Sequence, residues 1–153
     1  MVATFLKVKM KIAIGCDEIA IELKQSLIDI LEDKKIEYKD FGTGSEEPVD
    51  YPDIAASVAG EVQNGSYDRG ILVCGTGIGM ALTANKFRGI RAACCHDMYS
   101  TQRSILSNDC QIITMGSMIV GKSLAQELLK IWLDIERTGG TVKKVKKIEA
   151  LEK

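Results

Sequence analysis

The chain has 153 residues, 46% of them hydrophobic, which is enough to bury one compact core. Its 20 basic and 21 acidic residues leave a formal net charge of −1, so charge gives no reason to expect nucleic acid or an anionic membrane as a partner. No apolar stretch approaches the roughly 20 residues of a membrane span, and residues 1–9 are too evenly charged for a signal peptide. We therefore expect a cytoplasmic protein that handles a small polar ligand.

The cysteines support the same location. They are odd in number and have no CxxC spacing, which argues against a disulfide framework and against a zinc site. We expect reduced thiols at all five positions, which are Cys16, Cys74, Cys94, Cys95 and Cys110.

Short apolar runs alternate with amphipathic stretches along the whole chain, which is typical of an α/β fold. In chain order we predict a strand at 11–15, a helix at 19–34, a strand at 36–41, a turn-rich segment at 42–52, a helix at 53–64 capped by Asp53, a strand at 70–74, a helix at 78–86, a strand at 90–95, a helix at 98–107, a strand at 111–115 and a helix at 121–137.

Two of these predicted strands, 70–74 and 90–95, are nearly continuous apolar runs, as in parallel strands covered on both faces. The pattern predicts a single doubly wound, Rossmann-like α/β domain in three layers, with a mostly parallel sheet of about five strands.

A glycine-rich turn follows the predicted strand at 70–74, and Cys74 stands at its start. Glycines let the backbone approach a ligand closely, and successive N–H groups at a helix start form an anion-binding nest. Such a nest would favour the thiolate of Cys74, which makes this residue a candidate base or nucleophile. The spacing alone fits a tight turn around a small buried cysteine equally well. The three glycines are Gly75, Gly77 and Gly79.

Polar side chains adjoin several predicted strands, and doubly wound sheets bind ligands beyond the carboxyl ends of their strands. Taken singly, each has a plain structural role: Asp17 could cap a helix, Tyr51 could be a core ring and Asn108 could stabilise a turn. A lone histidine is more often a capping or surface residue than a chemical one. We expect the set to line a sugar-sized pocket at one edge of the sheet; its members are Asp17, Glu18, Tyr51, His96, Ser107 and Asn108.

Several motifs occur in one order along the chain. They are MKIAIGCD at 10–17, DFGT at 40–43, DYP at 50–52, DRGILVCGTGIG at 68–79, ANK at 84–86, GIRAA at 89–93, ND at 108–109 and GS at 116–117. With them the chain resembles the type B ribose-5-phosphate isomerases and the related galactose-6-phosphate isomerase subunits. The match begins at Met10, so residues 1–9 would be an extension that precedes a single domain over residues 10–153.

This resemblance implies aldose–ketose isomerisation of a phosphorylated sugar through a cis-enediolate, with Cys74 as the base. Thr76 and the N–H groups of the glycine turn would hold the developing oxyanion, while Asp17, Tyr51 and Asn108 would bind the sugar. It implies no metal and no organic cofactor. It also implies a homodimer or a dimer of dimers whose site is shared between subunits, with residues 116–120 as contact surface.

The chain also departs from the family pattern. Glu18 and Ser107 stand where the ribose enzymes carry histidines, the second of which opens the sugar ring. Neutral residues stand where the family has basic groups for the phosphate; they are Met118, Thr141 and Val145. Charge could come instead from the lysines at 143–147, which also read as a solvated basic helix, or from Arg103 or His96.

Three hypotheses remain open: an active isomerase, a subunit that works only in a mixed oligomer, and a sugar-phosphate binder without activity. For an active enzyme, Ser107 favours a substrate that needs no ring opening, because serine is a poor general acid. A tetrose 4-phosphate cannot close a furanose ring, whereas ribose 5-phosphate would need His96 to replace the missing acid.

Overall fold

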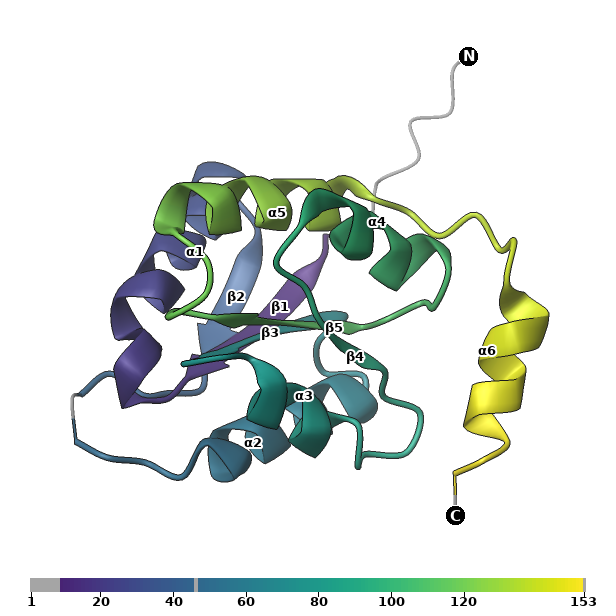
Figure 1. Ribbon diagram of the computed structural model, residues 1–153, viewed down its shortest axis with the longest axis horizontal. Coiled ribbons are helices and arrows are strands. Elements are labelled where there is room, and N and C mark those ends of the chain that lie inside the picture. The colour runs from purple at the N-terminus through teal and green to yellow at the C-terminus, as the bar shows by residue number, and fades with distance from the viewer. Residues whose placement is uncertain (1–8, 46, 153) are drawn as a thin grey trace.

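The computed structural model describes residues 9–45 and 47–152 (Figure 1). Apart from Lys9, the expected N-terminal extension lies outside the described residues. The elements are β1 (Lys11–Cys16), a 3-10 turn η1 (Glu18–Ala20), α1 (Ile21–Asp33), β2 (Glu37–Asp40), α2 (Tyr51–Gln63), β3 (Arg69–Cys74), α3 (Ile78–Ala84), β4 (Ala92–Cys94), α4 (Met98–Leu106), β5 (Ile112–Gly116), α5 (Lys122–Asp134) and α6 (Val142–Glu149).

The five strands form one parallel sheet in the order β2-β1-β3-β5-β4. Helices α1, α4 and α5 cover one face, α2 and α3 cover the other, and α6 lies beyond the β4 edge (Figure 1). This arrangement confirms the predicted doubly wound, three-layer fold. In the register Cys16 lies opposite Val73, and Cys74 lies opposite Gly116. The carboxyl ends of β1, β3 and β5 therefore lie side by side.

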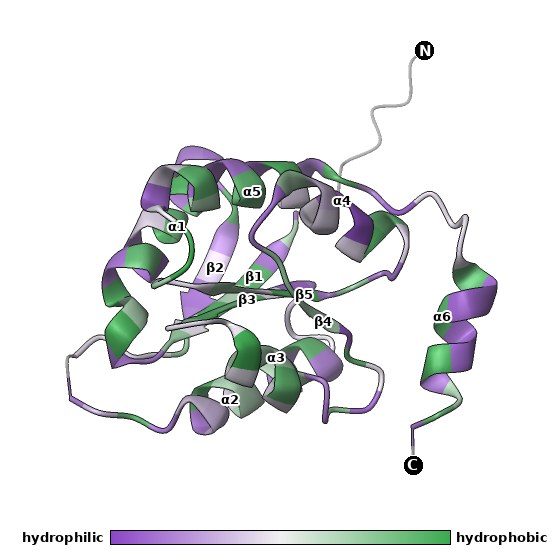
Figure 2. Cartoon of the chain, in the orientation of Figure 1, coloured by the Kyte–Doolittle hydropathy of each residue, from purple (hydrophilic) through white to green (hydrophobic). Residues whose placement is uncertain are grey.

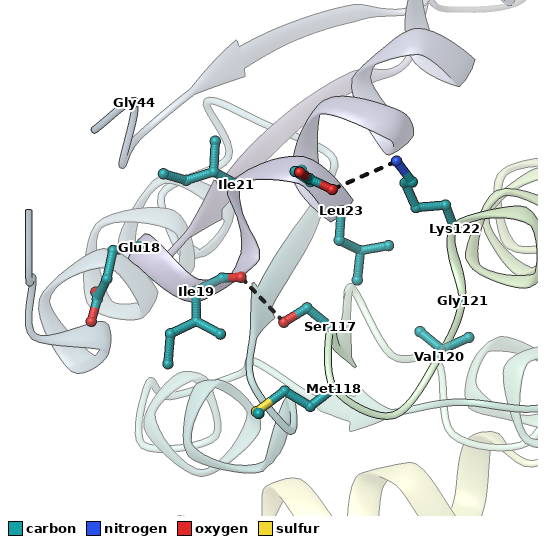
Figure 3. Close-up of a pocket in the computed structure, with 11 residues that line it drawn as sticks. Glu18, Ile19, Ile21, Leu23, Gly44, Ser117, Met118, Val120, Gly121 and Lys122 are labelled. Carbon is teal, nitrogen blue, oxygen red and sulfur yellow. Dashed lines mark hydrogen bonds and ion pairs between the residues drawn. The ribbon is translucent and has the colours of Figure 1, made fainter. Parts of the chain in front are cut away.

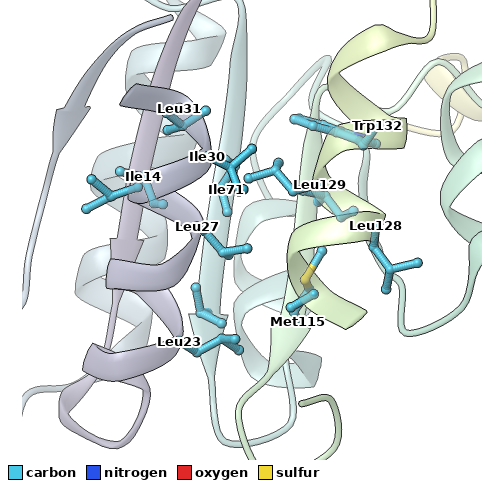
Figure 4. Packing of buried hydrophobic residues seen from close by; sticks show 14 of the residues in the cluster. Ile14, Leu23, Leu27, Ile30, Leu31, Ile71, Met115, Leu128, Leu129 and Trp132 are labelled. Atoms are coloured by element: carbon cyan, nitrogen blue, oxygen red, sulfur yellow. The ribbon is translucent and has the colours of Figure 1, made fainter. Parts of the chain in front are cut away.

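The core has two parts because the sheet is apolar on both faces (Figure 2). On the α1/α5 face, Leu27 of α1 and Leu129 of α5 pack over Ile71 of β3, and Trp132 is fully buried beside them (Figure 4). The i, i+4 spacing of leucines along α1 brings this stripe onto the sheet. No helix within the described ranges is long and apolar enough to cross a membrane.

Most predicted bounds shift by one to three residues in the structure, and the predicted helix at 19–34 divides into η1 and α1. Two of the differences have a clear cause. Helix α2 begins at Tyr51, with Asp50 rather than Asp53 at the N-cap position, because Pro52 is tolerated in the first turn, where its missing N–H costs nothing. Strand β4 is only three residues long and half exposed, since it lies at the edge of the described sheet, beside β5. The basic C-terminal run forms α6, as predicted.

Candidate functional site

The glycine turn brings backbone donors to Cys74. The N–H of Gly77 points at the Cys74 sulfur at 3.1 Å, and only 5% of Cys74 is exposed. Gly77 has φ +77°, and a Cβ there would lie 2.8 Å from the carbonyl carbon of Met115 in β5. Only glycine can therefore pass this close to β5 in this conformation.

Thr76 stands at the exposed tip of the same turn. Its hydroxyl oxygen accepts the N–H of Ile78 at 3.3 Å, which orients the side chain toward the start of α3. A Cβ at Gly116 would lie 2.6 Å from the Thr76 Cα, so the turn rests directly on the end of β5. The tip is thus held by backbone packing while its side chain stays accessible.

Tyr51 reaches the turn from α2. A Cβ at Gly79 would lie 2.5 Å from the Tyr51 Cζ, which means that the ring packs closely against the glycine backbone. The side chain is 41% exposed, so the hydroxyl can meet a ligand. The structure therefore brings Tyr51, Cys74 and Thr76 together.

Asp17 completes this group from the end of β1. Its N–H donates to the Val73 carbonyl at 3.3 Å, next to Cys74, and its carboxylate accepts the N–H of Ile19 at 3.2 Å. The residue is buried, and burial raises the pKa of its carboxyl group above the usual range. Asp17 thus caps η1, the plain role considered for it, at the same carboxyl edge as Cys74.

His96 follows β4 at the same carboxyl edge. Its Nε2 accepts the N–H of Gly116 at 2.8 Å, and burial lowers the pKa of the imidazole. Because an accepting Nε2 carries no proton, the neutral ring holds its proton on Nδ1. His96 therefore tethers the end of β4 to β5 just behind Cys74.

Glu18 has a structural partner. Its carboxylate accepts the N–H of Val49 at 3.1 Å and so holds the loop before α2. Glu18 also lines a cavity of about 720 Å³ on the α1/α5 side, where Lys122 lies 3.6 Å from Glu22 (Figure 3). With two carboxylates and one ammonium group, the cavity offers no net positive charge to a phosphate.

Lys24 is a buried cation that sequence reasoning missed. Its ammonium group lies 2.6 Å from an Asp40 carboxylate oxygen and 2.7 Å from the Thr43 carbonyl. The contacts fix the loop after β2 against Cys16, whose pKa burial raises to about 11. The weak available signal was the position of Lys24 next to Leu23 on the apolar side of α1.

Ser107 and Asn108 do not join this group, so the expectation of one pocket at one edge is wrong for them. They precede β5, whereas Cys74 lies opposite Gly116 at the end of β5. At about 3.3 Å per residue, the five residues of β5 alone separate the two places by about 13 Å. A turn that precedes a parallel strand lies at the amino edge of the sheet, which the sequence reading overlooked.

A salt-bridged arginine holds this second corner. The guanidinium of Arg91 donates to the carbonyl oxygens of Asn108 and Asp109, both at 3.0 Å from Nε, and also contacts the Asp109 carboxylate at 3.1 Å. Asp109 has φ +50°, a left-handed conformation that is uncommon for non-glycine residues. Arg91 therefore fixes the direction of the Ser107–Asn108 turn.

The fold and the carboxyl-edge group define an α/β protein with a candidate small-ligand site beside a cysteine and a glycine turn. Within the described residues, no three His, Cys, Asp or Glu side chains lie close enough together to hold a metal ion.

Comparison with known proteins narrows this class. A model of the Ribose/Galactose Isomerase family matches residues 12–151. The ribose-5-P isomerase B of Listeria innocua is 60% identical over 131 residues, which cover 86% of this chain and 88% of the relative. The D-erythrulose-4-phosphate isomerase of Pectobacterium atrosepticum is 48% identical over 143 residues, which cover 91% of this chain and 93% of the relative.

A solved structure agrees. The ribose-5-phosphate isomerase B of Clostridium thermocellum superimposes with a TM-score of 0.91 at 43% identity, covering 94% of this chain and 97% of that one. The chain belongs to the Ribose/Galactose Isomerase family.

Proposed function

We propose that this chain interconverts the aldose and ketose forms of a phosphorylated sugar, with Cys74 as the base. The observation that carries the proposal is the Gly77 N–H aimed at the Cys74 sulfur at 3.1 Å. A donor in that place stabilises negative charge on sulfur, and a thiolate is the form that can take a proton from carbon. The similarity to named sugar-phosphate isomerases supports the same activity.

The proton balance is simple. The Cys74 thiolate takes the proton from the carbon next to the carbonyl, and the electron pair moves onto the carbonyl oxygen to give an enediolate. The thiol then returns the proton to the neighbouring carbon, while the hydroxyl proton passes from one enediolate oxygen to the other, so that the former hydroxyl becomes the new carbonyl and the former carbonyl becomes a hydroxyl. Thr76 and the backbone N–H groups of Gly75 and Gly79 would hold the oxyanion between these steps. Asp17 and Tyr51 would bind sugar hydroxyls, because Asp17 is bound to Val73 next to Cys74 and Tyr51 packs against Gly79 of the glycine turn.

We propose a homodimer or a dimer of dimers in which each site combines residues from two copies. Cys74 and Asn108 lie at opposite edges of the sheet, so both can serve one substrate only if a second copy supplies one of them. Large apolar side chains exposed around the carboxyl edge support such a contact; they are Ile19, Ile78, Leu82, Met98, Tyr99, Met118 and Ile119.

The substrate we favour is an acyclic tetrose 4-phosphate. Ring opening needs an acid, and neutral His96 could supply only its Nδ1 proton, which would leave an unfavourable imidazolate. Protonating Nε2 instead would break its bond to Gly116. Ser107 is a poor acid as well. The Pectobacterium relative named for erythrulose 4-phosphate supports this choice, and the Listeria relative keeps ribose 5-phosphate as the rival.

Competition kinetics on the purified protein alone test these proposals. With erythrulose 4-phosphate and ribose 5-phosphate in one assay, we expect the higher kcat/KM for the tetrose. A higher value for ribose 5-phosphate that is lost in His96→Ala would assign ring opening to His96. Activity that needs a second, different subunit would favour the mixed oligomer, and binding without turnover would favour the inactive binder.

We also propose a cytoplasmic location. The chemistry needs a reduced thiol, and the cytoplasm keeps cysteines reduced. All five cysteines are free, which is consistent with that compartment.

A further inference from the structure

The phosphate of the proposed substrate carries close to two negative charges and needs a cation, but within residues 9–45 and 47–152 Lys24 and Lys122 at the carboxyl edge each have a carboxylate partner. Lys24 is buried against Asp40 and the Thr43 carbonyl. Lys122 lies beside Glu22, with the Glu18 carboxylate lining the same cavity. A guanidinium offers a phosphate more than these lysines do, because its planar fork donates to two oxygens at once. The inference drawn from such a group at the amino edge rests on the proposed function.

The corner around Asn108 at the amino edge is rich in arginine. Two of its guanidinium groups are committed to carboxylates: Arg91 pairs with Asp109 and Glu149 at 3.1 and 2.9 Å, and Arg137 pairs with Asp109 at 2.7 Å. The Arg91 pairs hold the turn and the C-terminal helix together, so Arg91 is structural. Arg137 contacts Asp109 through one terminal nitrogen, and within the described residues its buried Nε and its other terminal nitrogen have no hydrogen-bond partner.

Arg103 differs from both. Its Nε donates to the Ser107 hydroxyl oxygen at 2.7 Å, and within residues 9–45 and 47–152 it has no carboxylate partner. The amide of Asn108 reaches the Arg103 carbonyl at 3.4 Å, so the three residues form one unit. Wherever the Ser107–Asn108 turn meets a substrate, the Arg103 guanidinium is beside it.

We infer that Arg103, supplied by the second copy, binds the phosphate of the substrate, and that Ser107 is the residue that positions it. With Nε committed to Ser107, the two terminal nitrogens of the guanidinium remain to donate to two phosphate oxygens. Arginine is suited to this role because its planar fork matches the phosphate oxygens.

The same unit explains why a tetrose phosphate would be preferred. In a furanose pentose phosphate, oxygen O4 closes the ring and must receive a proton before isomerisation. In a tetrose 4-phosphate, O4 carries the phosphate instead. A guanidinium does not release a proton at neutral pH, so Arg103 cannot open a ring, but it can bind the dianion attached to O4.

Kinetics with and without the phosphate group test the inference. We expect Arg103→Gln to raise KM for erythrulose 4-phosphate by roughly ten- to a hundredfold, since a hydrogen bond to a charged group is lost. Activity toward unphosphorylated erythrulose should be unchanged. Arg103→Lys should recover part of the loss. Ser107→Ala should raise KM less and leave kcat nearly unchanged. Arg88→Gln is the matched control, because Arg88 is exposed and 4.0 Å from its partner Glu152.

The outcomes are separable. Equal loss on both substrates, or no loss at all in Arg103→Gln, would overturn the role of Arg103 while leaving the isomerase proposal intact. If the unaltered protein isomerises no sugar phosphate, the proposed function fails. Calorimetry with inorganic phosphate then tests separately whether Arg103 binds a phosphate. Weaker phosphate binding in Arg103→Gln would support the anion site, and equal binding would overturn it.

Subunit mixing tests whether the arginine acts in the neighbouring site. When Cys74→Ala and Arg103→Gln dimers are dissociated and remixed, half of the dimers are hybrids, each with one intact site if the site is shared. About one quarter of the unaltered activity should then return. No recovery would place Arg103 in the site of its own chain and overturn its assignment to the second copy.

Discussion

His96 accepts the backbone N–H of Gly116 through Nε2 at 2.8 Å, and Gly116 lies opposite Cys74 in the β3–β5 register. One imidazole therefore fastens the short edge strand β4 to the strand that supports the glycine turn. The bond exists only while Nε2 is unprotonated, so its persistence depends on pH.

We expect the free energy of unfolding to fall as pH is lowered below about 6.5, the ordinary pKa of histidine. Burial lowers the pKa of His96 in the folded chain, so the unfolded chain binds more protons in the window between the two values. The stabilisation is complete above the unfolded pKa and is lost as pH falls toward the folded one. Urea unfolding at several pH values measures this.

The chain has one histidine, so a variant isolates its effect. In His96→Gln the amide oxygen can still accept an N–H but does not titrate. Histidine titrates in the range of roughly pH 5.5 to 7. If the stability of His96→Gln depends on pH in this range as strongly as that of the unaltered protein, His96 is not the cause of the pH dependence.

Cys74→Ala should lower kcat/KM by on the order of a hundredfold or more, because the proton-transfer group is lost. The fold should persist, since the side chain is small. Cys95→Ala is the matched control: Cys95 is also buried but lies in the α1/α5 core, so its loss should lower the melting temperature and leave kcat/KM nearly unchanged. Near-normal activity in Cys74→Ala would rule out the cysteine base.

Thr76→Ala should lower kcat more than it raises KM, because an oxyanion donor acts mainly in the transition state. The residue is exposed, so stability should change by less than about 0.5 kcal/mol. Thr76→Ser keeps the hydroxyl and should restore most of the rate. A change confined to KM would instead place Thr76 in the ground-state binding pocket.

Gly79→Ala should displace the Tyr51 ring, since the new Cβ would lie 2.5 Å from its Cζ. The helix gains at most about 1 kcal/mol in propensity, so stability can stay near normal while substrate binding weakens. Gly140→Ala is the control, because a Cβ there meets nothing within 4 Å. Equal KM values in the two variants would show that the tyrosine does not contact substrate.

Local patterns sufficed for much of the fold. Apolar runs predicted the strands, and the leucine spacing of α1 predicted its buried face. The glycine turn was readable because Gly77 needs a positive φ, a property of a single residue. The N-cap of α2 was misplaced by three residues, since Asp50 and Asp53 are equivalent as caps in the sequence and Pro52 in the first turn decides between them.

The sequence by itself therefore determined the three-layer fold, the cysteine at the end of β3 and the amide turn around it, since these depend on periodicity and local backbone preference. The tertiary structure alone decided that Asn108 lies at the edge opposite Cys74, that Glu18 holds Val49 and that His96 is held by Gly116. Such contacts join residues far apart in the chain, and their geometry follows from strand order and register, which no local pattern encodes.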